Sequence, residues 1–563
     1  MAYNEGTPTA TGPLAATPGA LSGPAPSGAT SEATRLLCVG TYLDVEFRSR
    51  VIEELVEHEE RTAAPSLGMD AVSVLAHAFR ARTLEMQLAA VLLALWAAFV
   101  TLSVQHVGPG GKGPLPDSSP WALPWAAFYG AICLLIWLGR TIGGRNTAVS
   151  VVDDQSRSTT PTGRRATSAR YIRRVAWAGA IYYWWAVISG PAVVAIIFPL
   201  AIAAAIGWHR YRVARVFRTD LSSELFVDGP RPALPDTPRC RRIGAAIDRE
   251  QYSPMVIYDP FRPFIGAGEA HGAWSLAIEL RRKKPSPEPD ADTDTDTDGL
   301  TSRDVLDLIT PRLERLKKVS ADTSRDRLKD LELQECVLLP PGPHRGEMLY
   351  SPETVAEHIT AAVDEGAEAR RLFLRIRVGA WDEQVIVTIL VRVHTQGGML
   401  VLEVIPHVLG PVRAEFGRGD AIAGRAEGGI VRGTVAALLT APVASVATAV
   451  SAGRALSGVF RLWLSDPRDL PADGPAASVR ELGTRPGVLL FQEMDVSRYV
   501  KTIQDRIVSG AHEALKSQGY DTGEFEQQVF NIAQGAVFIG GSMSGGAVAT
   551  GDAGTATYNA GGE

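Results

Sequence analysis

The chain has 563 residues, of which 46% are hydrophobic, and a formal net charge of −6. A net charge this small does not indicate a polyanionic partner, so we expect no nucleic acid. The four Cys residues are far apart and form no CxxC or Cys/His ligand pattern, which excludes the usual zinc motifs and suits a reducing cytoplasm.

The N-terminal part divides into two regions before the first strongly apolar block. Residues 1–33 are mainly Ala, Thr, Pro, Gly and Ser, a composition that predicts a disordered tail. Residues 34–84 carry apolar side chains at helical spacing and are expected to form a cytoplasmic helical region. No charged start followed by an apolar core is visible, so the first membrane span is expected to serve as the insertion signal.

Three uncharged apolar blocks follow, at residues 88–104, 121–139 and 175–208. About 20 apolar residues cross a bilayer as a helix, so the first two blocks predict one span each. The third block is too long for one span, and Gly190-Pro191 lies near its middle, where Pro disfavours a continuous helix. We therefore expect the third block to cross the membrane twice.

Arginines at the ends of these blocks predict the topology. The connection 141–174 and the juxtamembrane segment 209–237 are rich in Arg, which places both in the cytoplasm beside anionic lipid head groups. The start of the second of these segments is expected to lie along the bilayer surface. The topology-setting residues are Arg140, Arg145, Arg164, Arg165, Arg173, Arg174, Arg210 and Arg212.

The resulting prediction is a multi-pass protein of the cell (inner) membrane with two hairpins, 85–140 and 175–208, and both termini in the cytoplasm. The alternative is that block 175–208 is one kinked helix, which would leave the C-terminal half outside. None of the blocks contains Asp, Glu, Lys, Arg or His, whereas ion and proton pathways usually need one of these residues. The spans are therefore expected to be anchors rather than parts of a pump.

A cytoplasmic α+β domain is expected at 238–426, with an acidic linker at 285–300. Alternating apolar residues and short turns predict that its last three strands form an antiparallel meander. Pro311 is expected to kink or split an amphipathic helix. The predicted strands are 255–258, 274–280, 372–378, 384–394 and 399–405, and the predicted helices are 305–316 and 352–363.

A helical region is expected at 427–530. Within it, residues 433–453 carry no charge, but their hydrophobicity is low and Pro442 interrupts them. This segment is either a fifth span or a buried or membrane-surface helix, and the second interpretation is favoured. Residues 495–517 predict an amphipathic helix. Residues 531–563 are rich in Gly and predict a flexible tail or, alternatively, a short β-segment that adds to a partner's sheet.

No motif for catalysis or for a cofactor is recognised. Gly266-Ala-Gly268 is half of a dinucleotide fingerprint without its third Gly, so a rigid loop is the better interpretation. The run of Asp from 294 to 298 lacks the Glu that closes a calcium loop, since Val305 stands there. None of the ten His residues has metal-site spacing. We expect no catalytic residue, no cofactor and no metal.

Were the Pro/Gly-rich loop a contact with a partner, aromatic and Arg side chains would dominate its binding energy. The candidate partner-contact residues are Arg262, Phe264 and Trp274.

Several stretches resemble a group of uncharacterised multi-pass membrane proteins of actinobacteria. The stretches are Arg35–Gly40, Ala64–Asp70, Pro263–Gly268 with Trp274-Ser275, Trp381-Asp382 in the meander, and Asp521–Phe525 ahead of the Gly-rich tail. The resemblance covers most of the chain outside the N-terminal tail and the acidic linker. It implies no known activity and no catalytic residue.

The function expected from these features is an integral membrane scaffold or sensor. It would anchor a cytoplasmic α+β module and dock a cytosolic protein complex, such as stress, defence or injection-type machinery, at the membrane, and it could form a homo-oligomer. The alternative is a membrane-perturbing effector or oligomeric pore, built by close packing of small residues. An enzyme is the third hypothesis.

Overall fold

The computed structural model describes residues 28–105, 124–143, 164–189, 193–283, 300–323, 326–342, 344–364, 370–381, 383–425, 430–464, 470–485 and 487–533. The expected tail before residue 28, most of the acidic linker and the Gly-rich tail after residue 533 lie outside these residues. So do Arg145, Asp382 and Gly190-Pro191.

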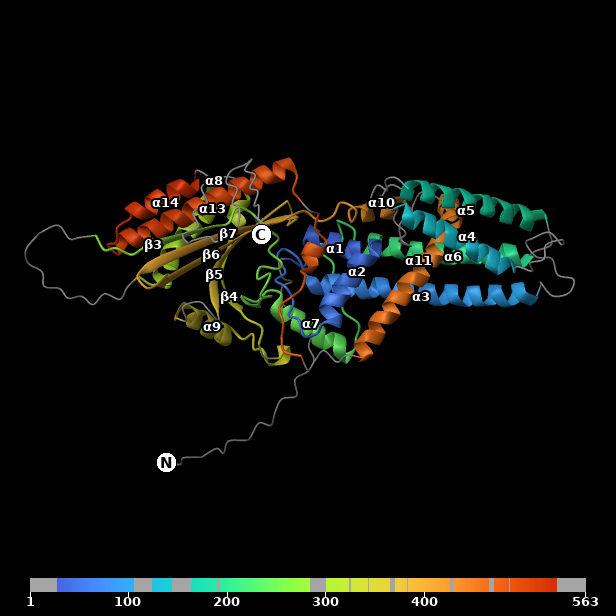
Figure 1. Cartoon of the computed structure of the whole chain (residues 1–563), viewed down its shortest axis with the longest axis horizontal. Helices are drawn as coiled ribbons and strands as arrows, with labels where there is room; N and C mark the ends of the chain where they lie inside the picture. The colour runs from blue at the N-terminus through green and yellow to red at the C-terminus, as the bar shows by residue number, and fades with distance from the viewer. Residues whose placement is uncertain are drawn as a thin grey trace, which may run out of the picture.

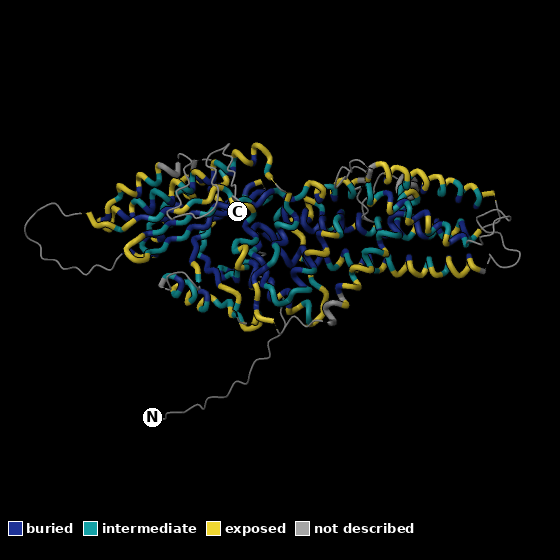
Figure 2. Tube along the Cα trace, in the orientation of Figure 1, coloured by how far each residue is buried: buried dark blue, intermediate teal, exposed yellow. Residues whose placement is uncertain are grey.

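The described chain is elongated and has three parts in a row (Figure 1). A bundle of long helices lies at one end, a sheet covered by helices lies at the other, and a layer of short helices joins them. Exposed residues line the outside of the bundle, whereas the joining layer is mostly buried (Figure 2).

The joining layer is built from the N-terminal region. Helix α1 (Glu32–Leu43) begins at Ser31, whose hydroxyl accepts a hydrogen bond from the Thr34 amide, and all its residues after Glu32 are buried. Helix α2 (Val45–Ile52), the π-helical turn η1 (Glu53–Glu57) and helix α7 (Pro238–Glu250) pack around it. The expected cytoplasmic helical region is therefore a core around which the other parts assemble.

The bundle contains α3 (Ala71–Gln105), α4 (Trp125–Ile142), α5 (Arg164–Ser189) and α6 (Val193–Thr219). The third apolar block forms two helices, as its Gly-Pro pair predicts. Helix α3 runs from the joining layer into the bundle without a break, so the expected boundary between residues 84 and 85 lies inside one helix. Helix α6 runs straight through the Arg-rich start of 209–237. That start does not form a separate surface helix.

Aromatic side chains fill the centre of the bundle. The Phe99 and Phe198 rings stack with centroids 5.2 Å apart, and the Trp96 and Tyr129 rings stack at 5.8 Å. The Tyr183 hydroxyl donates to the Ala195 carbonyl at 2.7 Å, which ties α5 to α6. These contacts give the bundle a packed interior.

Four helices are long and apolar enough to cross a membrane, at Ala71–Val104, Trp125–Ile142, Val193–Thr219 and Ala436–Gly458. The number agrees with the four expected spans. The helices themselves are not all the expected ones, because α5 is missing from this set and part of α11 (Ile430–Leu464) takes its place. Helix α11 lies obliquely across the bundle rather than along it (Figure 1).

The other end is a seven-stranded mixed sheet in the order β1-β4-β5-β6-β7-β2, with β3 also paired to β7. Strands β5, β6 and β7 follow one another along the chain and pair antiparallel, while β1 and β4 pair parallel. The strands are β1 (Met255–Ile257), β2 (Glu269–Ala270), β3 (Trp274–Glu279), β4 (Glu332–Leu339), β5 (Arg371–Ala380), β6 (Val385–Gln396) and β7 (Met399–Leu409). The sequence pattern missed β4, because polar residues interrupt its first half.

One face of the sheet is covered by α8 (Ser302–Thr323), α13 (Leu490–Ser517) and α14 (Gly523–Ala533) (Figure 1). Helix α9 (Pro352–Asp364) packs beside β4 and β5. Pro311 lies inside α8 without ending it, so the expected split does not occur. A Cβ on Gly510 of α13 would lie 2.8 Å from the Ile309 Cα, which shows how closely α13 and α8 approach.

Candidate functional site

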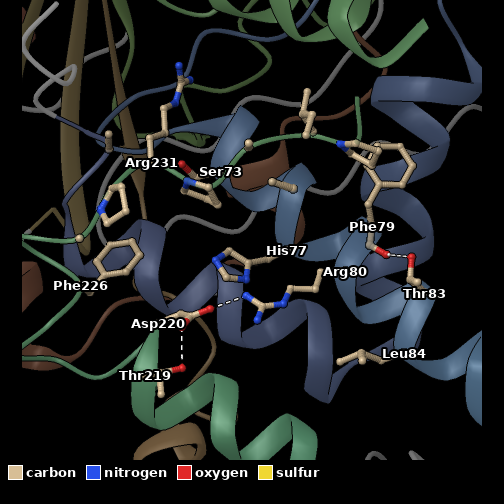
Figure 3. A pocket seen from close by; sticks show the side chains of 18 of the residues that line it. Ser73, His77, Phe79, Arg80, Thr83, Leu84, Thr219, Asp220, Phe226 and Arg231 are labelled. Carbon is tan, nitrogen blue, oxygen red and sulfur yellow. Dashed lines mark hydrogen bonds and ion pairs between the residues drawn. The ribbon is translucent and has the colours of Figure 1, made fainter. Parts of the chain in front are cut away.

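A groove lies where the bundle meets the joining layer. Its cavity has a volume of about 700 Å³ and lies between α3, α6 and the segment 221–237 (Figure 3). The walls combine apolar side chains, such as Leu84 and Phe226, with Arg80, Arg212 and Asp220. The groove is therefore amphipathic and lies next to the predicted membrane segment.

Asp70 holds one end of the groove together. Its carboxylate caps α3 by accepting from the Val72 amide at 3.3 Å and the Ser73 amide at 3.2 Å. Arg231 donates to both of its oxygens, at 2.7 and 2.6 Å, and also binds Asp248. This clamp fixes segment 221–237 across the start of α3 and so shapes the wall of the cavity.

The carboxyl group of Asp70 is fully buried. Burial acts to raise its pKa, but hydrogen bonds and charge from Arg231, together with Ser73 and Gln251, outweigh burial and hold the pKa below its ordinary value. The clamp is therefore ionised at neutral pH.

The floor of the groove carries a second ion pair. Arg80 of α3 pairs with Asp220, which directly follows α6, and the Thr219 hydroxyl donates to the same carboxylate at 2.5 Å. In Figure 3, Arg80 and His77 both point toward Asp220. Burial acts to raise the pKa of Asp220, but Thr219 and Arg80 lower it below its ordinary value. The pair therefore keeps a cation and an anion facing the cavity.

Basic side chains extend the groove toward the bundle. An adjoining cavity of about 510 Å³ shares Arg80, Arg212 and Asp220 with the first and adds Arg215. Arg212 donates to the Gln87 side chain at 2.7 Å. Four arginines (Arg80, Arg212, Arg215 and Arg231) and one carboxylate, that of Asp220, line the two cavities, so the lining is net positive.

The predicted topology-setting arginines come together at one end of the bundle only in part. Arg212 lines the groove, whereas Arg210 turns away and donates to the Thr440 hydroxyl of α11 at 2.6 Å. Arg140 lies in the last turn of α4, and a Cβ on the neighbouring Gly139 would lie 3.4 Å from the Arg173 backbone nitrogen in α5. Arg164, Arg165 and Arg174 also belong to α5.

The three candidate partner-contact residues do not share one surface. Phe264 packs on Phe373 and His407, with ring centroids at 5.5 and 5.2 Å, on the sheet face opposite to the main core. Trp274 packs against the main core. Arg262 is exposed and donates to the Ala476 carbonyl at 2.7 Å. Their role in binding a partner stays a prediction.

The Gly266-Ala-Gly268 loop binds a carboxylate of the chain itself. Glu481 in the short helix α12 (Val479–Leu482) accepts from the Gly266 amide at 2.8 Å and the Gly268 amide at 3.0 Å. Both glycines have positive φ, at 99° and 96°, which turns their amides toward one oxygen. The loop is therefore an internal junction, held by a carboxylate of the chain itself.

Arg480, the neighbour of Glu481, is completely buried. Its guanidinium donates to the carbonyl oxygens of Gln384 and Gly410 at 2.8 and 2.9 Å, and to the Thr484 hydroxyl at 2.7 Å. Burial lowers its pKa to about 10. Sequence reasoning missed both residues, because a single Arg-Glu pair in a loop gives no signal of burial.

Within the part of the chain that the structure describes, no group of three or more His, Cys, Asp or Glu side chains could hold a metal ion. The four Cys residues are free thiols.

Residues 273–547 match the model of a family described as an AbeC-like domain. The match covers a little under half of the chain. It begins at β3 and includes α8 to α14, but it leaves out the helices α3–α6 and the groove. No curated protein and no solved structure matches the chain.

Proposed function

We propose that this protein is an integral membrane scaffold or sensor, anchored by α3, α4, α5 and α6, that holds a cytoplasmic α+β module for a cytosolic protein assembly. The observation that carries the proposal is that three parts of the chain, before, between and after the long apolar helices, pack into one body. We call this body, which consists of the joining layer and the sheet with its helices, the soluble body.

Contacts across this body join residues from before, between and after the long apolar helices. Arg35 binds Asp420, the Ala63 amide donates to Glu250 at 2.7 Å, and the Thr62 amide donates to the Asp473 carbonyl at 3.0 Å. Because these groups touch, we infer that the described residues within 28–70, 220–425 and 470–533 lie on one side of the membrane. Each stretch of chain that connects two of these parts would then cross the membrane an even number of times.

Four crossings between residues 71 and 219 satisfy this condition. Helix α5 must then cross together with α3, α4 and α6, although its apolar part is short, from Val175 to Ser189. Trp184 and Trp185 lie in that part, and such amphipathic aromatic residues suit a membrane interface. This supports the two predicted hairpins.

Helix α11 does not cross in this topology. Thr440 near its start binds Arg210, and the Ala455 carbonyl near its end accepts from Arg82 at 2.8 Å. Both arginines lie at the same end of the bundle, just outside the apolar blocks. The small residues of α11 pack on α4 and α6, where Ala437 lies 3.6 Å from the position of a Gly207 Cβ. We infer that α11 is an oblique brace against the bundle that does not cross the membrane.

The arginine-rich ends of α4, α5 and α6 support a cytoplasmic orientation of the soluble body. Its surface also carries exposed apolar side chains at the start of α13, where Leu490 is 70% and Phe491 73% exposed. Exposed apolar patches are typical of surfaces that bind other proteins. These features support a docking role.

Reporter fusions test the topology. Fusions after residues 112, 150, 225, 428 and 468, each made to alkaline phosphatase and to a fluorescent protein, report the outer and inner sides. We expect only the fusion after residue 112 to report the outside. An outer signal after 225, or opposite signals after 428 and 468, would overturn the topology.

Affinity purification of the full-length protein in mild detergent, with quantitative mass spectrometry, tests docking. We expect a near-stoichiometric cytosolic partner that is lost from the double variant Leu490→Lys/Phe491→Lys. The matched control is Leu349→Lys, since Leu349 is 67% exposed elsewhere on the same module. Recovery of the protein alone, with no enriched partner, would count against the scaffold.

A further inference from the structure

We infer that the groove between α3, α6 and segment 221–237 binds the phosphate head group of an anionic phospholipid from the adjoining leaflet. This inference rests on the proposed membrane topology and goes beyond it, because it assigns a specific lipid site rather than general attraction to a charged surface.

The depth of the arginines fits a head group. Arg212 and Arg215 follow Trp208, the last residue of the apolar block, by four and seven residues. At about 1.5 Å per residue these positions lie about 6 and about 10 Å beyond it along α6. The polar layer of a leaflet extends roughly 5 to 8 Å beyond the hydrocarbon core. Arg212 therefore lies within the head-group layer and Arg215 just beyond it.

An aromatic pair lies at the level from which this depth is measured. Trp208 and Tyr211 stack with ring centroids 5.5 Å apart, and they are 63% and 49% exposed. Trp and Tyr concentrate at the boundary between hydrocarbon and head groups. The pair directly precedes Arg212, so the groove opens where the bilayer surface would lie.

The chemistry of the lining suits a phosphate with an apolar neighbour. A guanidinium group carries five N–H donors and binds phosphate oxygens two at a time. Arg212 gives one of its donors to Gln87, which leaves others for a ligand. Leu84 lines both cavities and supplies an apolar wall. A cavity of about 700 Å³ is large enough for a head group rather than for a single ion.

Asp220 sets the affinity. Its carboxylate pairs with Arg80 inside the groove, so a phosphate must compete with it for that cation. The next carbonyl, Leu221, accepts a hydrogen bond from Arg35 of α1 at 3.0 Å. The Arg80–Asp220 pair therefore lies directly beside the contact between Arg35 and Leu221 at the centre of the soluble body.

Native mass spectrometry of the full-length protein in mild detergent tests the site. The protein is titrated with phosphatidylglycerol and, separately, with phosphatidylcholine. We expect one tightly bound phosphatidylglycerol per chain, and about a tenfold weaker affinity for it in Arg212→Gln/Arg215→Gln. We expect Asp220→Asn to bind it at least about twofold more tightly, because Arg80 loses its competing anion.

The matched control is Arg173→Gln/Arg174→Gln, which removes the same charge from the same end of the bundle outside the groove. An equal loss in both double variants would show diffuse attraction and overturn the site. Weaker binding in Asp220→Asn would also contradict it. Thermal unfolding of each variant separates a binding defect from misfolding.

Inorganic phosphate at millimolar concentration distinguishes the source of the phosphate group. We expect it to leave the bound phosphatidylglycerol in place, whereas displacement would point to a soluble ion and overturn the lipid assignment. Binding in detergent does not depend on sidedness. If the protein binds no lipid but the reporter fusions give the expected pattern, this inference alone is refuted. An altered pattern of the fusions would instead refute the topology.

Discussion

Arg35 of α1 donates two hydrogen bonds to the carboxylate of Asp420 in α10 (Arg418–Arg425), at 2.7 and 3.0 Å, across 385 residues of sequence. The side chain of Arg35 is almost completely buried, whereas that of Asp420 is half exposed. The same guanidinium binds Glu32 and the Leu221 carbonyl. One cation thus joins the start of the described chain, the end of the membrane segment and the end of the sheet.

Replacing Arg35 by Met should destabilise the soluble body by about 2 kcal/mol, because the Leu221 carbonyl loses a buried hydrogen bond. Asp420→Asn should cost less, since its carboxylate is already half solvated. Thermal unfolding of both single variants and the double variant measures their coupling. Additive effects would show that the pair contributes nothing beyond its separate parts.

Asp70→Asn should lower the stability of the protein at neutral pH by about 2 kcal/mol, because the clamp to Arg231 loses its charge. The pKa of Asp70 is lower in the folded chain than its ordinary 3.8, so its contribution is present above that value and is lost as pH falls through the folded pKa. The wild-type and variant melting temperatures should therefore converge below about pH 4. A constant difference down to pH 2 would contradict this assignment.

Gly268→Ala should destabilise the junction by well over 1 kcal/mol, since a Cβ there would lie 2.3 Å from the Val408 carbonyl oxygen and φ is +96°. Gly272→Ala is the matched control, because φ there is +66° and no atom lies within 4 Å of the added Cβ. Only the cost of positive φ, about 1 kcal/mol, is expected for the control. Comparison of the two melting temperatures isolates the steric cost, and equal losses would show that the loop is open.

Arg480→Met should cost about 3 kcal/mol, because it leaves the carbonyl oxygens of Gln384 and Gly410 without their donor. Arg480→Lys should recover only part of this loss, since an ammonium group cannot span the same acceptors. Arg485→Gln, at an exposed position, serves as the control and should be nearly neutral. Full recovery by Lys, measured by thermal unfolding, would show that charge rather than geometry matters.

The sequence by itself determined the local elements. Uncharged runs and the arginines beside them predicted a membrane segment of four helices, because hydrocarbon excludes charge over a fixed thickness. Alternation predicted β5, β6 and β7, since a strand with one buried face repeats every two residues. The Gly-Pro pair correctly indicated that the block 175–208 is two helices rather than one.

Only the tertiary structure decided what these elements do together. By composition, α11 is apolar enough to cross a membrane and α5 is not among the helices that are, but contacts such as Arg35–Asp420 support the proposal that the parts before and after the bundle share a side. The carboxylate held by Gly266 and Gly268 comes from Glu481, and the groove from helices separated by more than 100 residues. A local sequence pattern shows which side chains a segment can bury. Which other segment of the chain it packs against depends on the path of the whole chain.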